Sequence, residues 1–195
     1  MTLPLAAWQQ LRDGQRPSHE RSPDQPVAAV FRCADAPVSI DAVFGQDAGA
    51  LFDISTWGHV VDKSVLGSLE YAVEKLEVPL IVVLGHDDCP AMQAALRAWE
   101  HAELPGGSMR RVIEHALASV VRRGTVADSV QSVAAAHIVE TGVALMQRSP
   151  MLSSRVDDRT CAIVCATVSS ADGEVQVHAT IGAVDESVSK VFELV

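Results

Sequence analysis

The chain has 195 residues, 48% of them hydrophobic and 21% charged, and these proportions exclude an intrinsically disordered protein. Its 15 Lys and Arg residues against 25 Asp and Glu residues give a formal net charge of −10, which argues against a protein that binds nucleic acid or anionic membranes. The mean hydropathy is +0.19, yet no apolar run approaches the roughly 18 residues of a membrane-spanning helix.

The length fits one domain, residues 1–195, whose first segment differs from the rest. Residues 3–12 place apolar side chains, Trp8 among them, at helical spacing, and the stretch 14–26 is polar and rich in proline. We therefore expect residues 1–26 to form an N-terminal helical arm and an extended linker. Such a short helix is marginal alone, so we expect it to pack against another element, often one of a partner subunit.

Beyond the linker, short apolar runs alternate with amphipathic segments. Strands are expected at 27–31, 51–55, 79–85, 160–168 and 174–180, the last two joined by a turn at Asp172-Gly173. Helices are expected at 40–44, after a possible cap at Asp62, and at 91–99, 108–122 and 128–148. The alternation predicts an α/β fold with a mostly parallel central sheet and flanking helices.

The start of the chain lacks the basic flank of a secretory signal, so the cytoplasm is the expected compartment.

The four cysteines do not indicate a disulfide framework in a chain of this length. Cys161 and Cys165 bound an apolar run and would share one face of a strand, so we expect them to be buried as small hydrophobic residues.

Metal-ligand residue types follow two of the predicted strands. Cys33 and Asp35 come after the first strand, and His86 and Cys89 come after the strand at 79–85. Functional residues of such sheets gather at the carboxyl ends of the strands. Two thiolates, an imidazole and a carboxylate suit tetrahedral Zn²⁺, so the sequence predicts a zinc site. A redox cysteine pair is a weaker alternative, because no C-x-x-C motif is present.

Three stretches resemble the β-class carbonic anhydrase family over nearly the whole chain. They are FRCADAPV around Cys33, residues 58–72, and VPLIVVLGHDDC ending at Cys89. The resemblance implies four parallel strands with an added edge strand, a homodimer or higher homo-oligomer, and zinc held by Cys33, His86 and Cys89. It implies reversible hydration of CO2 to bicarbonate, with Asp35 either accepting a hydrogen bond from the zinc-bound water or ligating the zinc itself.

The chain departs from the family pattern near that aspartate. An arginine follows two residues after the aspartate in the family, where Pro37 stands here, and a second usual arginine is replaced by Ser55. Trp57 stands where the family keeps a small residue. Without these cations we expect Asp35 to be drawn to the zinc, and a closed tetrahedral site has no position for water. Arg32 is not expected to compensate, because strand alternation directs it away from Cys33.

Three functions remain open on this basis. The first is a zinc-dependent carbonic anhydrase, with activity reduced by the missing arginines. The second is a zinc-binding homologue whose site Asp35 closes permanently, acting as a structural or regulatory dimer. The third keeps zinc-dependent hydrolysis and changes the substrate to another small linear molecule.

His59 is expected to be structural, and His137 is expected to be solvated or bound locally. Asp87 and Asp88 are expected to cap the next helix, with Asp87 alternatively orienting His86.

Overall fold

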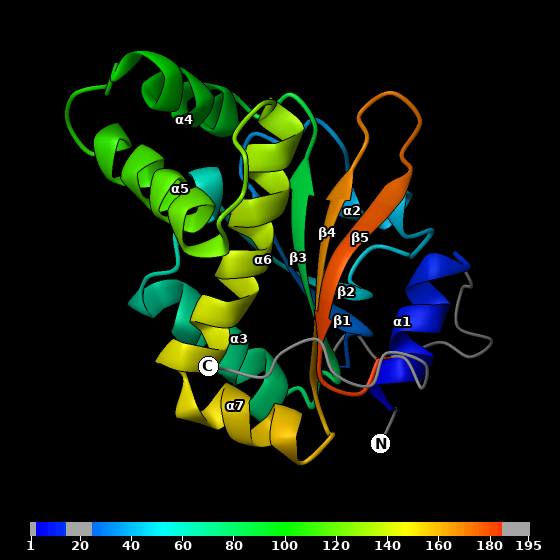
Figure 1. Ribbon diagram of the computed structural model, residues 1–195. Helices are drawn as coiled ribbons and strands as arrows, with labels where there is room; N and C mark the ends of the chain where they lie inside the picture. Colours follow the sequence, from blue (N-terminus) through cyan, green and yellow to red (C-terminus); the bar gives the residue numbers. More distant parts are fainter. Residues whose placement is uncertain (1–2, 15–24, 185–195) are drawn as a thin grey trace.

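The computed structural model describes residues 3–14 and 25–184, arranged around a five-stranded sheet of order β2-β1-β3-β4-β5 (Figure 1). The strands are β1 (Ala28–Cys33), β2 (Leu51–Thr56), β3 (Leu80–His86), β4 (Ala162–Val168) and β5 (Val175–Ile181). All pairs are parallel except the antiparallel pair of β4 and β5. The expected fold class is therefore confirmed. Every residue of β3 is buried, as its unbroken apolar sequence predicts for a central parallel strand.

Each expected helix is present, and one helix was not expected. The helices are α1 (Pro4–Arg12), α2 (Ile40–Val43), α3 (Lys63–Glu74), α4 (Pro90–His101), α5 (Met109–Arg123), α6 (Val130–Arg148) and α7 (Pro150–Asp157). The carboxylate of Asp62 caps α3 as expected, accepting from the N–H groups of Ser64 and Val65. The unexpected helix, α7, begins at a Ser149 cap followed by proline, a start signal that the sequence does contain.

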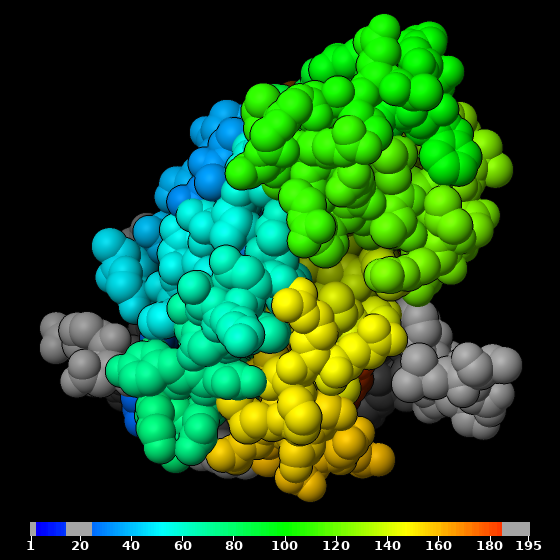
Figure 2. All heavy atoms as spheres, turned by 90° about the vertical axis from the view of Figure 1, so that its left-hand side faces the viewer, coloured from blue at the N-terminus to red at the C-terminus, as the bar shows by residue number. Residues whose placement is uncertain are grey.

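Helices α3, α6 and α7 cover one face of the sheet, where Phe31, Ile81 and Ile163 lie in a buried cluster with Leu69 and Leu152. Helices α4 and α5 pack with α6 beyond the carboxyl ends of the strands in a second cluster, composed largely of alanine and valine. Figure 2 shows this side of the molecule, where the helices form a continuous cover. Among the described residues, no helix is both long and apolar enough to cross a membrane.

The N-terminal helix α1 lies on the opposite face of the sheet, near α2 (Figure 1). Trp8 is only 8% exposed and joins Ala7 and Leu11 in a cluster with side chains of β1, β3 and β4. The expected helix is thus confirmed, and it packs against this chain's own sheet. Its apolar side is covered without a partner subunit. Residues 15–24 of the expected linker lie outside the described part.

Cys161 and Cys165 are both fully buried in the cluster beneath α6, which confirms the expectation for them. Burial raises the pKa of each thiol to about 12. A thiol that stays protonated at neutral pH is a poor nucleophile and a poor metal ligand. These two cysteines therefore belong to the hydrophobic core.

Two helical glycines give a matched test of this packing. A Cβ at Gly142 of α6 would lie 2.5 Å from Sγ of Cys165, whereas a Cβ at Gly67 of α3 would have no neighbour within 4 Å. We expect Gly142→Ala to lower the free energy of unfolding by about 1–3 kcal/mol through overpacking. Gly67→Ala should raise it by about 0.5–1 kcal/mol through helix propensity. Urea denaturation measures both, and equal effects of the two substitutions would contradict the packing described.

Candidate metal centre

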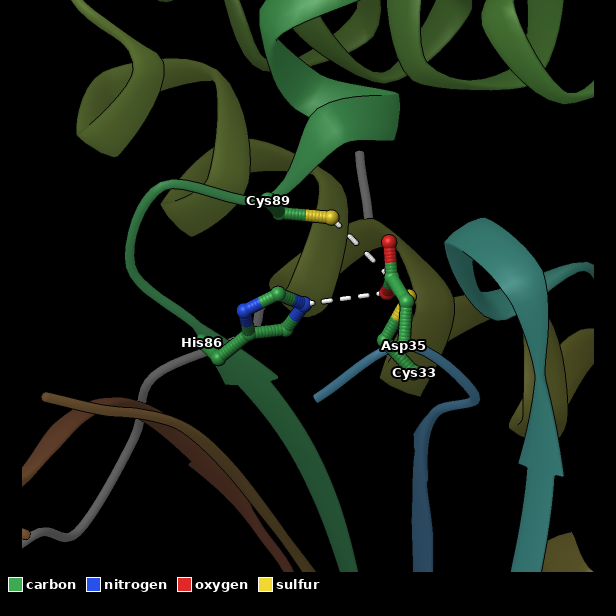
Figure 3. Close-up of side chains that lie close together, drawn as sticks. All are labelled: Cys33, Asp35, His86 and Cys89. Atoms are coloured by element: carbon green, nitrogen blue, oxygen red, sulfur yellow. Dashed lines mark hydrogen bonds and ion pairs between the residues drawn. The ribbon is translucent and has the colours of Figure 1, made fainter. Parts of the chain in front are cut away.

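Four potential ligands converge at the carboxyl edge of the sheet (Figure 3). β1 ends at Cys33 and β3 ends at His86, and these strands are parallel neighbours. Asp35 follows in the loop after β1, and Cys89 stands immediately before α4. The structure thus brings together all four residues that the sequence singled out, from segments that lie about 50 positions apart in the chain.

The spacing of the four ligand atoms suits a single ion, because all lie within 4.8 Å of one another. Tetrahedral zinc places two sulfurs roughly 3.8 Å apart and a nitrogen and an oxygen roughly 3.3 Å apart. The Sγ atoms of Cys33 and Cys89 are 3.9 Å apart, and Nε2 of His86 is 3.2 Å from Oδ1 of Asp35. The contact of 2.8 Å between Sγ of Cys33 and Oδ1 of Asp35 is a hydrogen bond, shorter than two zinc ligands would lie. The donor set and two of these three distances fit zinc.

The two thiols differ in how readily they ionise. The hydrogen bond between the two sulfurs lowers the pKa of Cys89, against burial that raises it, and N–H groups of Met92 and Ala91 lower it further. Those N–H groups belong to the first turn of α4, where unpaired amides favour an anion. The same sulfur pair raises the pKa of Cys33, with burial adding to the effect. Cys89 is therefore the thiol that ionises first.

Asp35 and His86 stabilise each other's charged form. Burial raises the pKa of Asp35, but hydrogen bonds from Cys33 and His86 outweigh it and hold that pKa below its usual range. For His86, burial lowers the pKa, and hydrogen bonds with Cys33 and Asp35 bring it above its ordinary value. A carboxylate is therefore present at neutral pH, ready to act as an anionic ligand.

Among the described residues, three side chains form hydrogen bonds with Asp35, and none of the three is an arginine. Oδ1 contacts Cys33 and His86, and Oδ2 accepts a hydrogen bond of 3.1 Å from Nε1 of Trp57. Arg32 is engaged elsewhere, because its guanidinium pairs with Asp53 of β2 at 2.9 Å. This confirms that Arg32 is directed away from the site.

A short turn after β2 also contacts Cys33. Gly58, within the 3-10 turn Trp57–His59, donates its N–H to Sγ of Cys33 at 3.1 Å. Its carbonyl accepts from Nε2 of His137 at 2.9 Å. Gly58 has φ of +66°, and a Cβ there would lie 2.3 Å from Val112, so only glycine fits. The turn therefore couples the site to the helical layer.

Two buried histidines lie behind the ligands. Two of the ligands border a cavity of about 10 Å³, which has room for about one water molecule. Its lining includes His59, His86, Cys89 and His137. His59 is 3% exposed and donates from Nε2 to the carbonyl of Leu84, and burial lowers its pKa to about 3. A histidine that stays neutral in this way is structural, as expected.

Two sequence expectations were wrong. Asp87 does not cap α4, because its carboxylate accepts from the N–H and hydroxyl of Ser170 in the β4–β5 loop. The residue at the start of α4 is Cys89, which makes no side-chain cap. His137 was expected to be solvated or bound locally, yet it is buried and bonds Gly58, 79 residues away. The hydrogen bonds of Asp87 with Ser170 connect the loop between His86 and Cys89 to the adjacent β4–β5 hairpin.

The sequence did not reveal the contacts of Trp57 and Gly58 with the site. Trp57 was notable only as a large ring in an unusual place, and nothing in the sequence aimed its N–H at Asp35. The one available signal was position, because the register pairs Cys33 with Thr56 and so brings the residues after β2 beside the ligands.

The fold and the four ligand-type side chains define a candidate metal centre at the carboxyl edge of a mostly parallel sheet. The family model for carbonic anhydrase matches residues 28–175, and the chain belongs to the carbonic anhydrase family. Carbonic anhydrase 2 of Mycobacterium tuberculosis is 41% identical over 205 residues, covering 96% of this chain and 99% of that protein. A carbonic anhydrase of Mycolicibacterium smegmatis is 38% identical over 200 residues, covering 94% and 97%.

Solved structures show the same fold. A Coccomyxa β-carbonic anhydrase in complex with acetazolamide superimposes with a TM-score of 0.68 at 22% identity, covering 80% of this chain and 73% of that one. A tetrameric β-carbonic anhydrase of Sordaria macrospora gives a TM-score of 0.68 at 18% identity, covering 80% and 83%. The resemblance inferred from the sequence is confirmed, and so is the enzyme family.

The burial of His137 predicts a specific dependence of stability on pH. Burial lowers its pKa to about 4, below the ordinary 6.5. Protonation of His137 is disfavoured in the folded state, so its contribution to the free energy of unfolding is fully present only above pH 6.5. That contribution is lost as the pH falls toward 4, because the unfolded chain binds a proton that the folded chain does not. Between pH 7 and 5 the native chain should lose about 2 kcal/mol through this group, and His137→Gln should not. Urea denaturation at both pH values tests the difference, and parallel losses in the two proteins would contradict it.

Proposed function

We propose that this chain catalyses the zinc-dependent reversible hydration of CO2 to bicarbonate and a proton. The zinc would be held by Cys33, His86 and Cys89. Asp35 would either take the fourth ligand position or lie beside it. The observation that supports this most directly is the convergence of four ligand atoms within 4.8 Å in a member of the carbonic anhydrase family. Zinc, when bound, supplies a Lewis acid that makes a water molecule acidic near neutral pH.

The chain's own groups would prepare the ligands. The N–H of Gly58 points at Sγ of Cys33, and the first-turn amides of α4 lower the pKa of Cys89, so both favour the anionic thiolates that zinc requires. The cavity behind His86 is too small for more than about one water. The substrate would therefore approach from the side of Asp35, whose side chain is 29% exposed.

Asp35 decides whether the fourth position is open. Its Oδ1 lies within the ligand group, 3.2 Å from Nε2 of His86, so the arrangement corresponds to the closed form of such a site. Turnover requires this oxygen to leave, and within residues 3–14 and 25–184 no guanidinium contacts it. We infer that hydration is slow unless Asp35 is drawn away from the ligands.

A second function follows from the same contact. A site closed permanently by Asp35 would make the chain a zinc-binding structural or regulatory protein. The position of Oδ1 favours this alternative, and the family's reaction favours the enzyme. The effect of a restored arginine separates them.

Assembly and compartment remain predictions. We propose a homo-oligomer, at least a dimer, in the cytoplasm. One solved relative of the same fold is described as tetrameric, which is consistent with assembly. Because α1 packs on its own sheet, a partner would have to contact another surface or the outer side of that helix.

The ligand assignment predicts that one cysteine matters for zinc and another does not. The native protein should contain about one zinc per chain, and Cys89→Ala should lose most of it, because a three-ligand site binds far more weakly. Cys161→Ala removes an equally buried sulfur from the core and should retain its zinc. Metal analysis after gel filtration measures both. Equal zinc content in the two variants would refute the assignment.

Restoring the missing arginine should increase turnover. Ala36→Ser combined with Pro37→Arg places a guanidinium two residues after Asp35, where it would compete with zinc for the carboxylate. We expect CO2 hydration, followed by stopped-flow at alkaline pH, to rise at least about tenfold, or roughly 1.4 kcal/mol.

The control for this variant is Ser154→Arg, which adds the same charge on the exposed side of α7. It should leave the rate unchanged. If both variants hydrate CO2 no faster than the native chain, the inference that Asp35 limits hydration by closing the site is wrong.

A further inference from the structure

The carboxylate of Asp35 is held at both of its oxygens. Oδ1 faces the ligand group, and Oδ2 accepts the hydrogen bond of 3.1 Å from the indole N–H of Trp57. Trp57 begins the turn directly after β2, and the residue before it, Thr56, pairs with Cys33. The two ends of this hydrogen bond thus lie in segments that directly follow neighbouring strands of one sheet.

The indole is itself fixed in place. Trp57 is half-buried against the cluster that α4 and α5 form. The next residue, Gly58, is bound by Cys33 on one side and His137 on the other. An N–H that is held in this way can direct a carboxylate, because its own position is set by packing and hydrogen bonds.

We propose that Trp57 is the positioning residue that keeps Asp35 among the metal ligands. A neutral donor restrains one oxygen without adding the positive charge that would draw the carboxylate away from zinc. The other oxygen, Oδ1, therefore stays directed at Cys33 and His86. This inference rests on the proposed function, since it assumes that the four residues bind zinc.

The test compares zinc affinity in two variants that separate the ring from the donor. Trp57→Phe keeps an aromatic ring and removes the N–H, whereas Trp57→Gln loses the ring and keeps an N–H donor. Loss of such an outer hydrogen bond lowers metal affinity by about 10–100-fold. We expect that loss in Trp57→Phe and a smaller one in Trp57→Gln, measured by competition for zinc with a chromophoric chelator. The reverse order would mean that the ring acts through packing, and would overturn the proposal.

A double-mutant cycle tests whether the effect passes through Asp35. In an Asp35→Ala background, Trp57→Phe should change zinc affinity less than about twofold, because its acceptor is gone. An equal loss in both backgrounds would overturn the proposal. Trp99→Phe is the matched control, since Trp99 is 49% exposed on α4 and no hydrogen bond of its indole is found in the described structure.

The visible spectrum of the cobalt-substituted protein adds a readout that is independent of turnover. We expect the band pattern of the native protein to change in Trp57→Phe and to persist in Trp99→Phe. Failure of the native protein to bind zinc or cobalt would defeat the proposed function. Normal binding with identical affinities in Trp57→Phe and Trp99→Phe would defeat only the role of Trp57.

Discussion

The parallel pairing of β1 with β3 is the constraint on which the candidate site depends. It places Cys33 and His86 at one edge of the sheet, although they lie 53 positions apart, and the loops that follow supply Asp35 and Cys89. Both strands are buried almost throughout, so their register is fixed by the core on either face. This pairing sets the positions of Cys33 and His86, whereas Asp35 and Cys89 come from the loops that follow the two strands.

Much of the fold and of the ligand group could be predicted from the sequence, because both depend on local patterns. The apolar run of β3 and the cap at Asp62 have strong local signals. The N–H of Trp57, the salt bridge that occupies Arg32 and the bond from His137 to Gly58 depend on which elements pack together. No spacing in the sequence encodes those contacts, and Asp87 shows how a plausible local cap is replaced by a distant partner.

Gly58 connects the chemistry of the edge to the packing of the helices. Its N–H contacts a candidate ligand, and its carbonyl contacts a histidine buried within α6. A group that binds at Cys33 would therefore be connected to α6 through this peptide segment. Stability and ligand geometry share this segment, so changes in α6 are not neutral for the site.

The hydrogen bond between Trp57 and Asp35 differs in kind from an ion pair between an arginine and a carboxylate. An arginine attracts a carboxylate through charge, and dissolved salt weakens that attraction at a partly exposed position. An indole N–H acts at contact distance, and Asp35 is 29% exposed, where such weakening matters. The contribution of this hydrogen bond to the placement of the carboxylate therefore depends less on ionic strength than an ion pair with arginine would.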